Sequence, residues 1–159
     1  MNAGRILATV ALVVGAASAA SAQTSTQVVT FQVTAINQIA FVGSPSLVVN
    51  TATAGSNPTS ASDASASWGV TTNQTNAKIT ASINSNMPAG LTLSVALAAP
   101  AGSTAIGNSL STTAVDLVTG ITKLAQASLG VIYTLDATPV AGVVASTTRT
   151  VTYTITGGT

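Results

Sequence analysis

Apolar and polar side chains alternate strictly near the end of the chain. Residues 149–156 read RTVTYTIT, so Val151, Tyr153 and Ile155 fall on one face and threonines fall on the other. A period of two residues is typical of a β-strand with one face on a core and one in water. This segment therefore predicts a half-buried strand.

The same alternation recurs along much of the chain. It predicts further strands at residues 26–35, 46–50, 68–72, 78–84, 91–97, 114–118 and 129–135. Small residues dominate 51–67 and 98–113, which predicts two loops, and residues 120–128 also allow one helical turn. About eight or nine short strands favour an all-β fold, an antiparallel immunoglobulin-like β-sandwich. A small closed barrel is the alternative.

The first 22 residues have the parts of a secretory signal peptide. Arg5 supplies a positive charge, residues 6–14 are apolar, and Ala20 and Ala22 place small side chains before the expected cleavage site. The apolar run is shorter than the roughly 20 residues that span a bilayer. We expect removal of residues 1–22, with residues 23–159 left as a single β-sandwich domain. That domain is expected to be secreted through the periplasm to the cell surface or beyond, without membrane insertion.

Charged side chains are scarce and balanced beyond position 22. They are Lys78, Lys123, Arg149, Asp63, Asp116 and Asp136. Disordered chains usually combine low hydrophobicity with high charge, whereas 47% of this sequence is hydrophobic, so a folded β protein is favoured. Nucleic-acid binding needs a basic surface, and the balanced charge predicts no such partner.

The residue types needed for common enzyme chemistry are missing. The sequence has no His, no Cys and no Glu, so general acid–base catalysis and serine nucleophiles lack their usual partner groups. Zinc lacks its usual ligands, and no loop has the ligand spacing of a calcium motif. We therefore expect no enzyme activity and no catalytic, cofactor or metal site, and stability must come from packing without disulfides.

Residues 26–35 carry a pattern suited to assembly. Val29, Phe31 and Val33 alternate with polar residues, and the segment holds no charge and no proline. Sheet edges are templates for pairing, and monomeric proteins usually protect them with such residues. The segment could therefore complete a neighbour's sheet as a donor strand, which predicts self-association. The other interpretation is that it forms the first strand of its own sandwich, ending in a bulge or bend near Ile36.

Trp68 is the single tryptophan and suggests a second kind of function. An exposed indole can stack on a sugar ring, which would give an adhesion or carbohydrate-binding module for surface glycans with loops 51–67 and 98–113 around it. The other interpretation is packing in the core at the start of a strand, because large aromatic side chains contribute much of a core's buried area.

Several features together resemble a known group of proteins. They are the signal peptide, the strand at 27–35, and Ala141-Gly142 before the final alternating run 149–155. The chain resembles bacterial secreted β-sandwich surface subunits of the pilin and spore-coat-U kind, without the usual disulfide. The resemblance implies an immunoglobulin-like fold and a structural role in a surface filament, coat or matrix.

Overall fold

The computed structural model describes residues 21–158. A compact unit covers residues 33–158, and the described residues 21–32 belong to a separate unit. The predicted signal peptide falls almost wholly outside the described residues. In the part of the chain that is described, no helix is long and apolar enough to cross a membrane.

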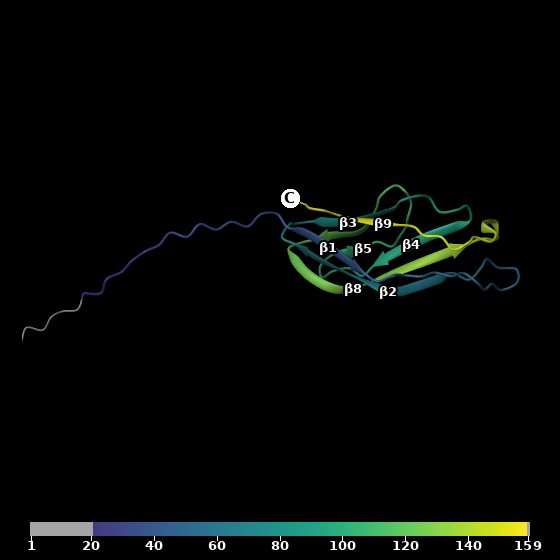
Figure 1. Cartoon of the computed structure of the whole chain (residues 1–159), viewed down its shortest axis with the longest axis horizontal. Helices are drawn as coiled ribbons and strands as arrows, with labels where there is room; N and C mark the ends of the chain where they lie inside the picture. The colour runs from purple at the N-terminus through teal and green to yellow at the C-terminus, as the bar shows by residue number, and fades with distance from the viewer. Residues whose placement is uncertain (1–20, 159) are drawn as a thin grey trace, which may run out of the picture. The chain divides into compact units, whose positions relative to one another are not determined.

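The compact unit is built from strands, as the alternation predicts (Figure 1). The elements are β1 (Asn37–Val42), β2 (Ala61–Thr72), β3 (Ala77–Ile83), β4 (Leu91–Leu97), β5 (Thr104–Ala105), β6 (Asn108–Ser109), β7 (Val115–Ile121), β8 (Leu124–Ala137), the 3-10 turn η1 (Pro139–Ala141) and β9 (Val151–Thr156). One sheet has the order β1-β2-β8-β4-β6 and the other β5-β7-β3-β9. Every pairing between strands is antiparallel.

The two sheets share one hydrophobic core, which is consistent with a β-sandwich. Two separate sheets also rule out the closed-barrel alternative. The alternation predicted for β3, β4 and β8 is confirmed, because the inward-facing side chains of these strands are buried. They are Ile79, Ala81, Ile83, Leu93, Val95, Leu97, Leu129, Val131 and Tyr133.

The prediction of a first strand at residues 26–35 is wrong for the single chain. Among the described residues 21–36 the structure assigns no strand, and β1 begins at Asn37. Asn37 pairs with Thr72, the last residue of β2, so β2 has no further residues to pair with an earlier segment. Alternation of apolar and polar residues shows that a segment can form a strand, but the strand also needs a neighbouring strand to pair with.

Four other segments also differ from the predictions. Residues 46–50 form no strand, and β2 begins at Ala61 inside the expected loop 51–67. The small residues of early β2 gave no apolar pattern, yet their backbone pairs with β8 from Ala61 onward. Loop 98–113 contains the two-residue strands β5 and β6. Residues 120–128 hold the tight turn between β7 and β8, with Lys123 at φ 42°, rather than a helical turn.

A single carboxylate fastens the long loop before β2. Asp63 accepts hydrogen bonds from the backbone N–H of Ser46 at 2.9 Å and of Ser65 at 2.7 Å. The Ser46 N–H, followed by the Ser65 hydroxyl and N–H, keeps the pKa of Asp63 below its ordinary value. The loop is thereby tied to the start of β2.

Candidate functional site

The sandwich has two kinds of sheet edge. Strands β5 and β6 end their sheets with two residues each, whereas β1 and β9 end theirs with six residues each. Short edge strands and edge charges are common protections against pairing with other chains. The long edges have neither, because their sequences are NQIAFV and VTYTIT. Their ladders to β2 and β3 also run without a bulge.

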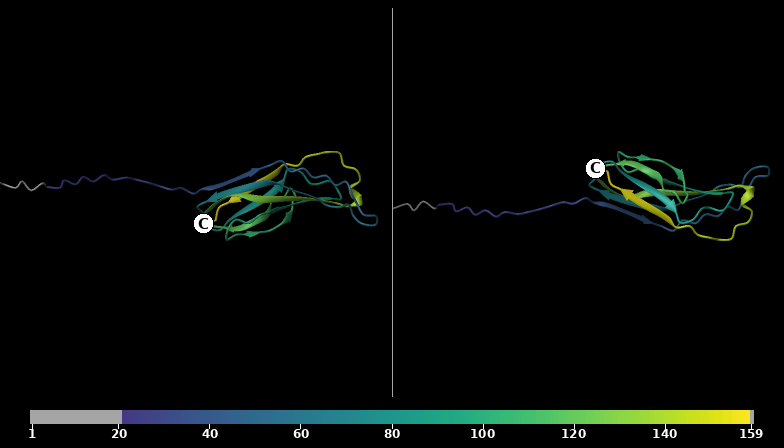
Figure 2. Two further views of the ribbon diagram at one scale, coloured as in Figure 1. Left: turned by 90° about the horizontal axis from the view of Figure 1, so that it is seen from below. Right: turned by 90° about the horizontal axis from the view of Figure 1, so that it is seen from above.

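The two long edges lie side by side, one from each sheet (Figure 2). The ring of Phe41 on β1 stacks on the ring of Tyr153 on β9, with centroids 3.8 Å apart and planes 12° apart. At the other end of the strands, Asn37 lies close to Gly157. β1 and β9 therefore run antiparallel to one another across the two sheets.

The apolar side chains between these edges are covered incompletely. On central strands the inward residues Ile79 and Val131 are fully buried. The inward residues of the edge strands pack against the same core but remain only partly buried. We call this group the open seam, and it consists of Ile39, Phe41, Val151, Tyr153 and Ile155.

An aromatic cluster lies behind the open seam. Phe41 stacks on Trp68 at 5.8 Å between ring centroids, and the hydroxyls of Tyr133 and Tyr153 share a hydrogen bond. Burial raises the pKa of both tyrosines, and for Tyr153 the hydrogen bond to Tyr133 raises it further. The cluster is uncharged across physiological pH, and it joins the seam residues Phe41 and Tyr153 to the buried Trp68 and Tyr133.

The tyrosine pair predicts a loss of stability at alkaline pH. Each phenol has a folded-state pKa above its unfolded value of about 10, so the stabilisation is complete below about pH 10 and is lost as the pH rises further. We expect the free energy of unfolding to fall by on the order of 1 kcal/mol per pH unit above that point, after allowance for solvent screening.

Urea denaturation between neutral and alkaline pH measures this effect. The control carries both Tyr133→Phe and Tyr153→Phe, which removes both phenol groups. A control that loses stability as steeply as the natural chain would show that the tyrosines are not responsible.

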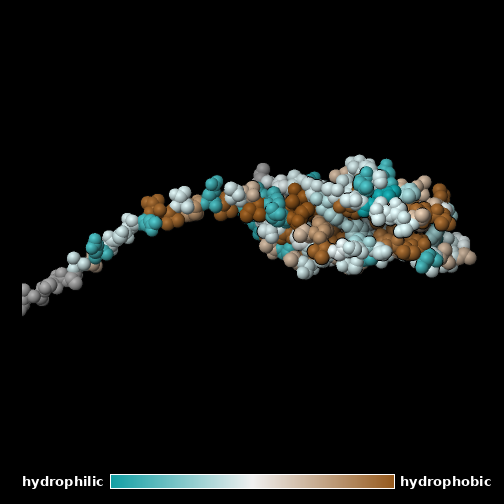
Figure 3. All heavy atoms as spheres, in the orientation of Figure 1, coloured by the Kyte–Doolittle hydropathy of each residue, from teal (hydrophilic) through white to brown (hydrophobic). Residues whose placement is uncertain are grey.

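The described residues before Val33 present their apolar side chains to solvent. Val28 is 94% exposed, Val29 73% and Phe31 89%, and Val33 at the start of the compact unit is 77% exposed. Apolar and polar residues follow one another along this segment in Figure 3. Of the five aromatic residues in the sequence, Phe31 alone lies outside the cluster just described.

The chain is fastened where this segment meets β1. The side-chain amide of Asn73 donates to the carbonyl of Thr34 at 2.7 Å and accepts from the N–H of Ile36 at 2.8 Å. The N–H of Asn73 also donates to the Ile36 carbonyl at 3.2 Å. Residues 34–36 are thus held in place although they belong to no strand.

Trp68 belongs to the core. Its side chain is 1% exposed, and its indole N–H has no hydrogen-bond partner among the described residues. A buried ring offers no face for a sugar to stack on. The burial therefore favours the packing interpretation over the carbohydrate-binding alternative.

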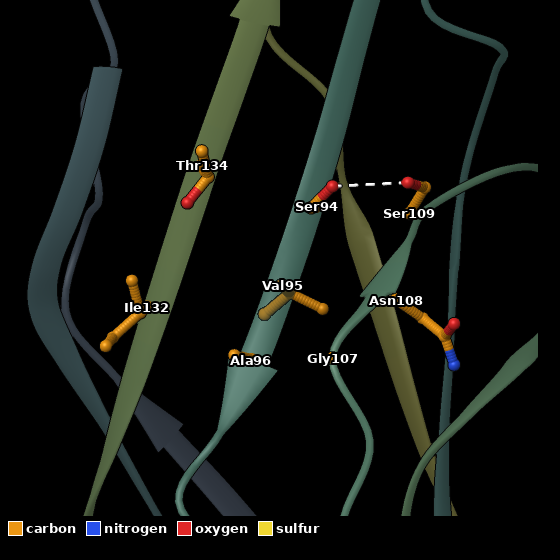
Figure 4. A pocket seen from close by; sticks show the side chains of 8 residues that line it. All are labelled: Ser94, Val95, Ala96, Gly107, Asn108, Ser109, Ile132 and Thr134. Atoms are coloured by element: carbon orange, nitrogen blue, oxygen red, sulfur yellow. Dashed lines mark hydrogen bonds between the residues drawn. The ribbon is translucent and has the colours of Figure 1, made fainter. Parts of the chain in front are cut away.

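A shallow hollow lies where β8, β4 and β6 meet (Figure 4). It encloses about 270 Å³, and Ser94 and Ser109 face one another there with their hydroxyl oxygens 3.2 Å apart. Ile132 and Thr134 lie on the neighbouring strand. None of the lining residues is titratable, so the hollow has no group for proton transfer.

Sequence reasoning gave Val29, Phe31 and Val33 a role but assigned none to the open seam. The seam cannot be recognised in the sequence, because it depends on β1 and β9 being the end strands of the two sheets. No family model matches the chain, and no match was found among curated proteins or among solved structures.

Proposed function

We propose that the chain is a secreted structural subunit that self-assembles into a filament, coat or matrix on the bacterial surface. Residues 26–35 of one copy act as a donor strand for a sheet of the next copy. The observation that carries the proposal is the exposed apolar alternation at Val29, Phe31 and Val33 in a segment without a partner strand. Addition of a strand to a free edge satisfies the backbone groups of both partners.

The strand order supports an incomplete immunoglobulin-like sandwich. The constant-type immunoglobulin fold places strands A, B, E and D in one sheet and C, F and G in the other. The order β1-β2-β8-β4 corresponds to A-B-E-D, and the neighbours β3 and β9 correspond to C and F. No strand of the described chain takes the place of G beside β9. A donor strand from another copy would supply this last strand.

The composition fits a surface polymer. A signal peptide provides the export route, and the near-zero net charge of the secreted chain removes the repulsion that keeps soluble proteins apart. Among the described charges, Lys78 and Asp116 form an ion pair within the unit at 3.0 Å. Subunits could therefore pack closely without charge repulsion.

A charge at Phe31 tests the proposed donor strand. Burial of a phenylalanine side chain contributes about 2–3 kcal/mol, and an unpaired buried carboxylate costs several kcal/mol more. We expect Phe31→Asp to raise the critical concentration for assembly at least about 100-fold. Light scattering of the purified mature protein over a concentration series measures this value.

Gln32→Asp provides the matched control, because it introduces the same charge on the opposite face of the strand. We expect its critical concentration to stay within about threefold of the natural value, as for most surface substitutions. If Phe31→Asp assembled as readily as Gln32→Asp, the donor role of this face would be lost.

A further inference from the structure

The two tyrosines are placed for a covalent link between the two sheets. Tyr133 lies on β8 of one sheet and Tyr153 on β9 of the other, and their hydroxyls share a hydrogen bond. We propose that this pair is an oxidative modification site, at which hydrogen peroxide and a haem peroxidase couple the two rings into dityrosine. The inference does not depend on the proposed self-assembly, because both rings belong to one chain.

The packing holds the two rings where coupling requires them. Coupling joins one ortho carbon of each ring, and an ortho carbon is only two bonds away from the hydroxyl oxygen. Hydrogen-bonded hydroxyls therefore bring the ortho carbons of both rings close together. Tyr133 is 8% exposed within the core, and the ring of Phe41 lies flat against the ring of Tyr153. The reaction thus needs side-chain rotation but no movement of the sheets.

An oxidant reaches the pair through the open seam. Tyr153 is only partly buried, and its strand β9 is the end strand of its sheet. A phenoxyl radical formed at Tyr153 can take a hydrogen atom from Tyr133 along their shared hydrogen bond. This exchange moves the radical to the buried ring and leaves Tyr153 as a phenol that can be oxidised again. Both rings can therefore become radicals although only one of them faces the solvent.

The reaction balances with a peroxide as the oxidant. The peroxidase removes one electron and the hydroxyl proton from each phenol, and the two phenoxyl radicals form a C–C bond between their ortho carbons. The hydrogen on each bonded carbon then moves to the ring oxygen, which restores both hydroxyls. In sum, two C–H bonds break, one C–C bond forms, and one molecule of hydrogen peroxide is reduced to two molecules of water.

Few other side chains in residues 23–159 compete for the oxidant. This part of the sequence has no Cys and no His, and its other readily oxidised side chains are Trp68 and Met87. Trp68 is 1% exposed and is thereby shielded. Oxidation of Met87 adds an oxygen atom, so its product differs in mass from the coupled pair. We therefore expect the tyrosine pair to be the main site of coupling.

A dityrosine link would supply the covalent stabilisation that many exported proteins obtain from disulfides. It would join β8 to β9 and close the loop of chain between residues 133 and 153. A covalent cross-link stabilises a fold mainly by restricting the unfolded chain. We expect coupled monomers to unfold at a urea midpoint about 1 M or more above that of untreated monomers.

Treatment of monomeric residues 23–159 with a haem peroxidase and hydrogen peroxide tests the proposal. The products are separated by size, and the monomer is examined by mass spectrometry, dityrosine fluorescence and mapping of linked peptides. We expect the monomer to lose the mass of two hydrogen atoms through a link between residues 133 and 153. At micromolar protein we expect linked monomer to exceed linked dimer at least about tenfold, because groups held in one chain have effective concentrations in the millimolar range.

The matched control moves one phenol to the other face of β8. It carries Tyr133→Phe together with Ile132→Tyr, so the chain keeps two tyrosines, and Ile132 is 48% exposed. We expect linked monomer from this control to fall at least about tenfold below that from the natural chain. Circular dichroism and Trp68 fluorescence check that the control is folded. Tyr133→Phe alone is the second variant and removes only a hydroxyl.

Equal yields of linked monomer from the natural chain and the folded control would overturn the proposal. A loss of two hydrogen atoms from the Tyr133→Phe monomer would place the link elsewhere and would also overturn it. The same holds for a natural chain that gives only linked dimers, only oxidised Met87, or no product while free tyrosine reacts in the same mixture.

Discussion

In a chain of residues 23–159, deletion of residues 23–35 is expected to abolish the proposed self-assembly while residues 36–159 remain folded. The deletion removes Val29, Phe31 and Val33, which are exposed and contribute nothing to the core. It also removes all the backbone groups that would pair with a neighbour, so the loss is larger than for any single substitution. Sedimentation velocity of both proteins at equal concentration measures the difference.

The fold of the shortened chain is checked separately. Trp68 is buried in the core, so its fluorescence reports the packed state, and circular dichroism reports the strands. We expect both signals to match those of the full mature chain before assembly. A shortened chain that is well folded and still forms polymers of the same appearance would contradict the donor role.

Gly90→Ala is expected to cause a large loss of stability. Gly90 has φ 78°, and an added Cβ would lie 2.5 Å from the backbone nitrogen of Ala141 and 2.8 Å from the hydroxyl oxygen of Thr138. The Gly90 carbonyl also accepts the N–H of Thr138 at 2.8 Å. Because the opposing atoms are largely backbone, we expect a loss of about 3–5 kcal/mol in the free energy of unfolding.

Gly102→Ala separates the clash from the cost of the backbone conformation. Gly102 has nearly the same φ, 76°, but nothing lies within 4 Å of its added Cβ. A left-handed residue alone costs about 1–2 kcal/mol, so we expect only this smaller loss. Urea denaturation followed by Trp68 fluorescence measures both, and equal losses would show that the contact between Gly90 and η1 is unimportant.

Much of the fold follows from the sequence because apolar and polar residues alternate along the core strands. The sequence predicts β4 at its observed bounds and β3 to within one residue at each end, since their apolar residues alternate without interruption. Early β2 is different, because its residues are small and polar and its strand exists through pairing with β8. Such a strand leaves no apolar pattern in its own sequence.

The candidate site was predictable only in part. The alternation of residues 26–35 indicated a strand that could pair, but no local signal states whether the partner lies in the same chain. Whether the partner lies in the same chain is decided by the pairing of β1 with β2. Thr72 is the last residue of β2 and pairs with Asn37, so β2 offers no residue to the segment before Asn37. The open seam likewise exists because β1 and β9 happen to be the neighbouring free edges of two sheets.

Negative-stain electron microscopy of purified residues 23–159 tests the proposed self-assembly most directly. We expect regular filaments or sheets, because each copy carries both an exposed apolar segment, at Val29, Phe31 and Val33, and the long free sheet edges of β1 and β9. Discrete single particles at high protein concentration would contradict it.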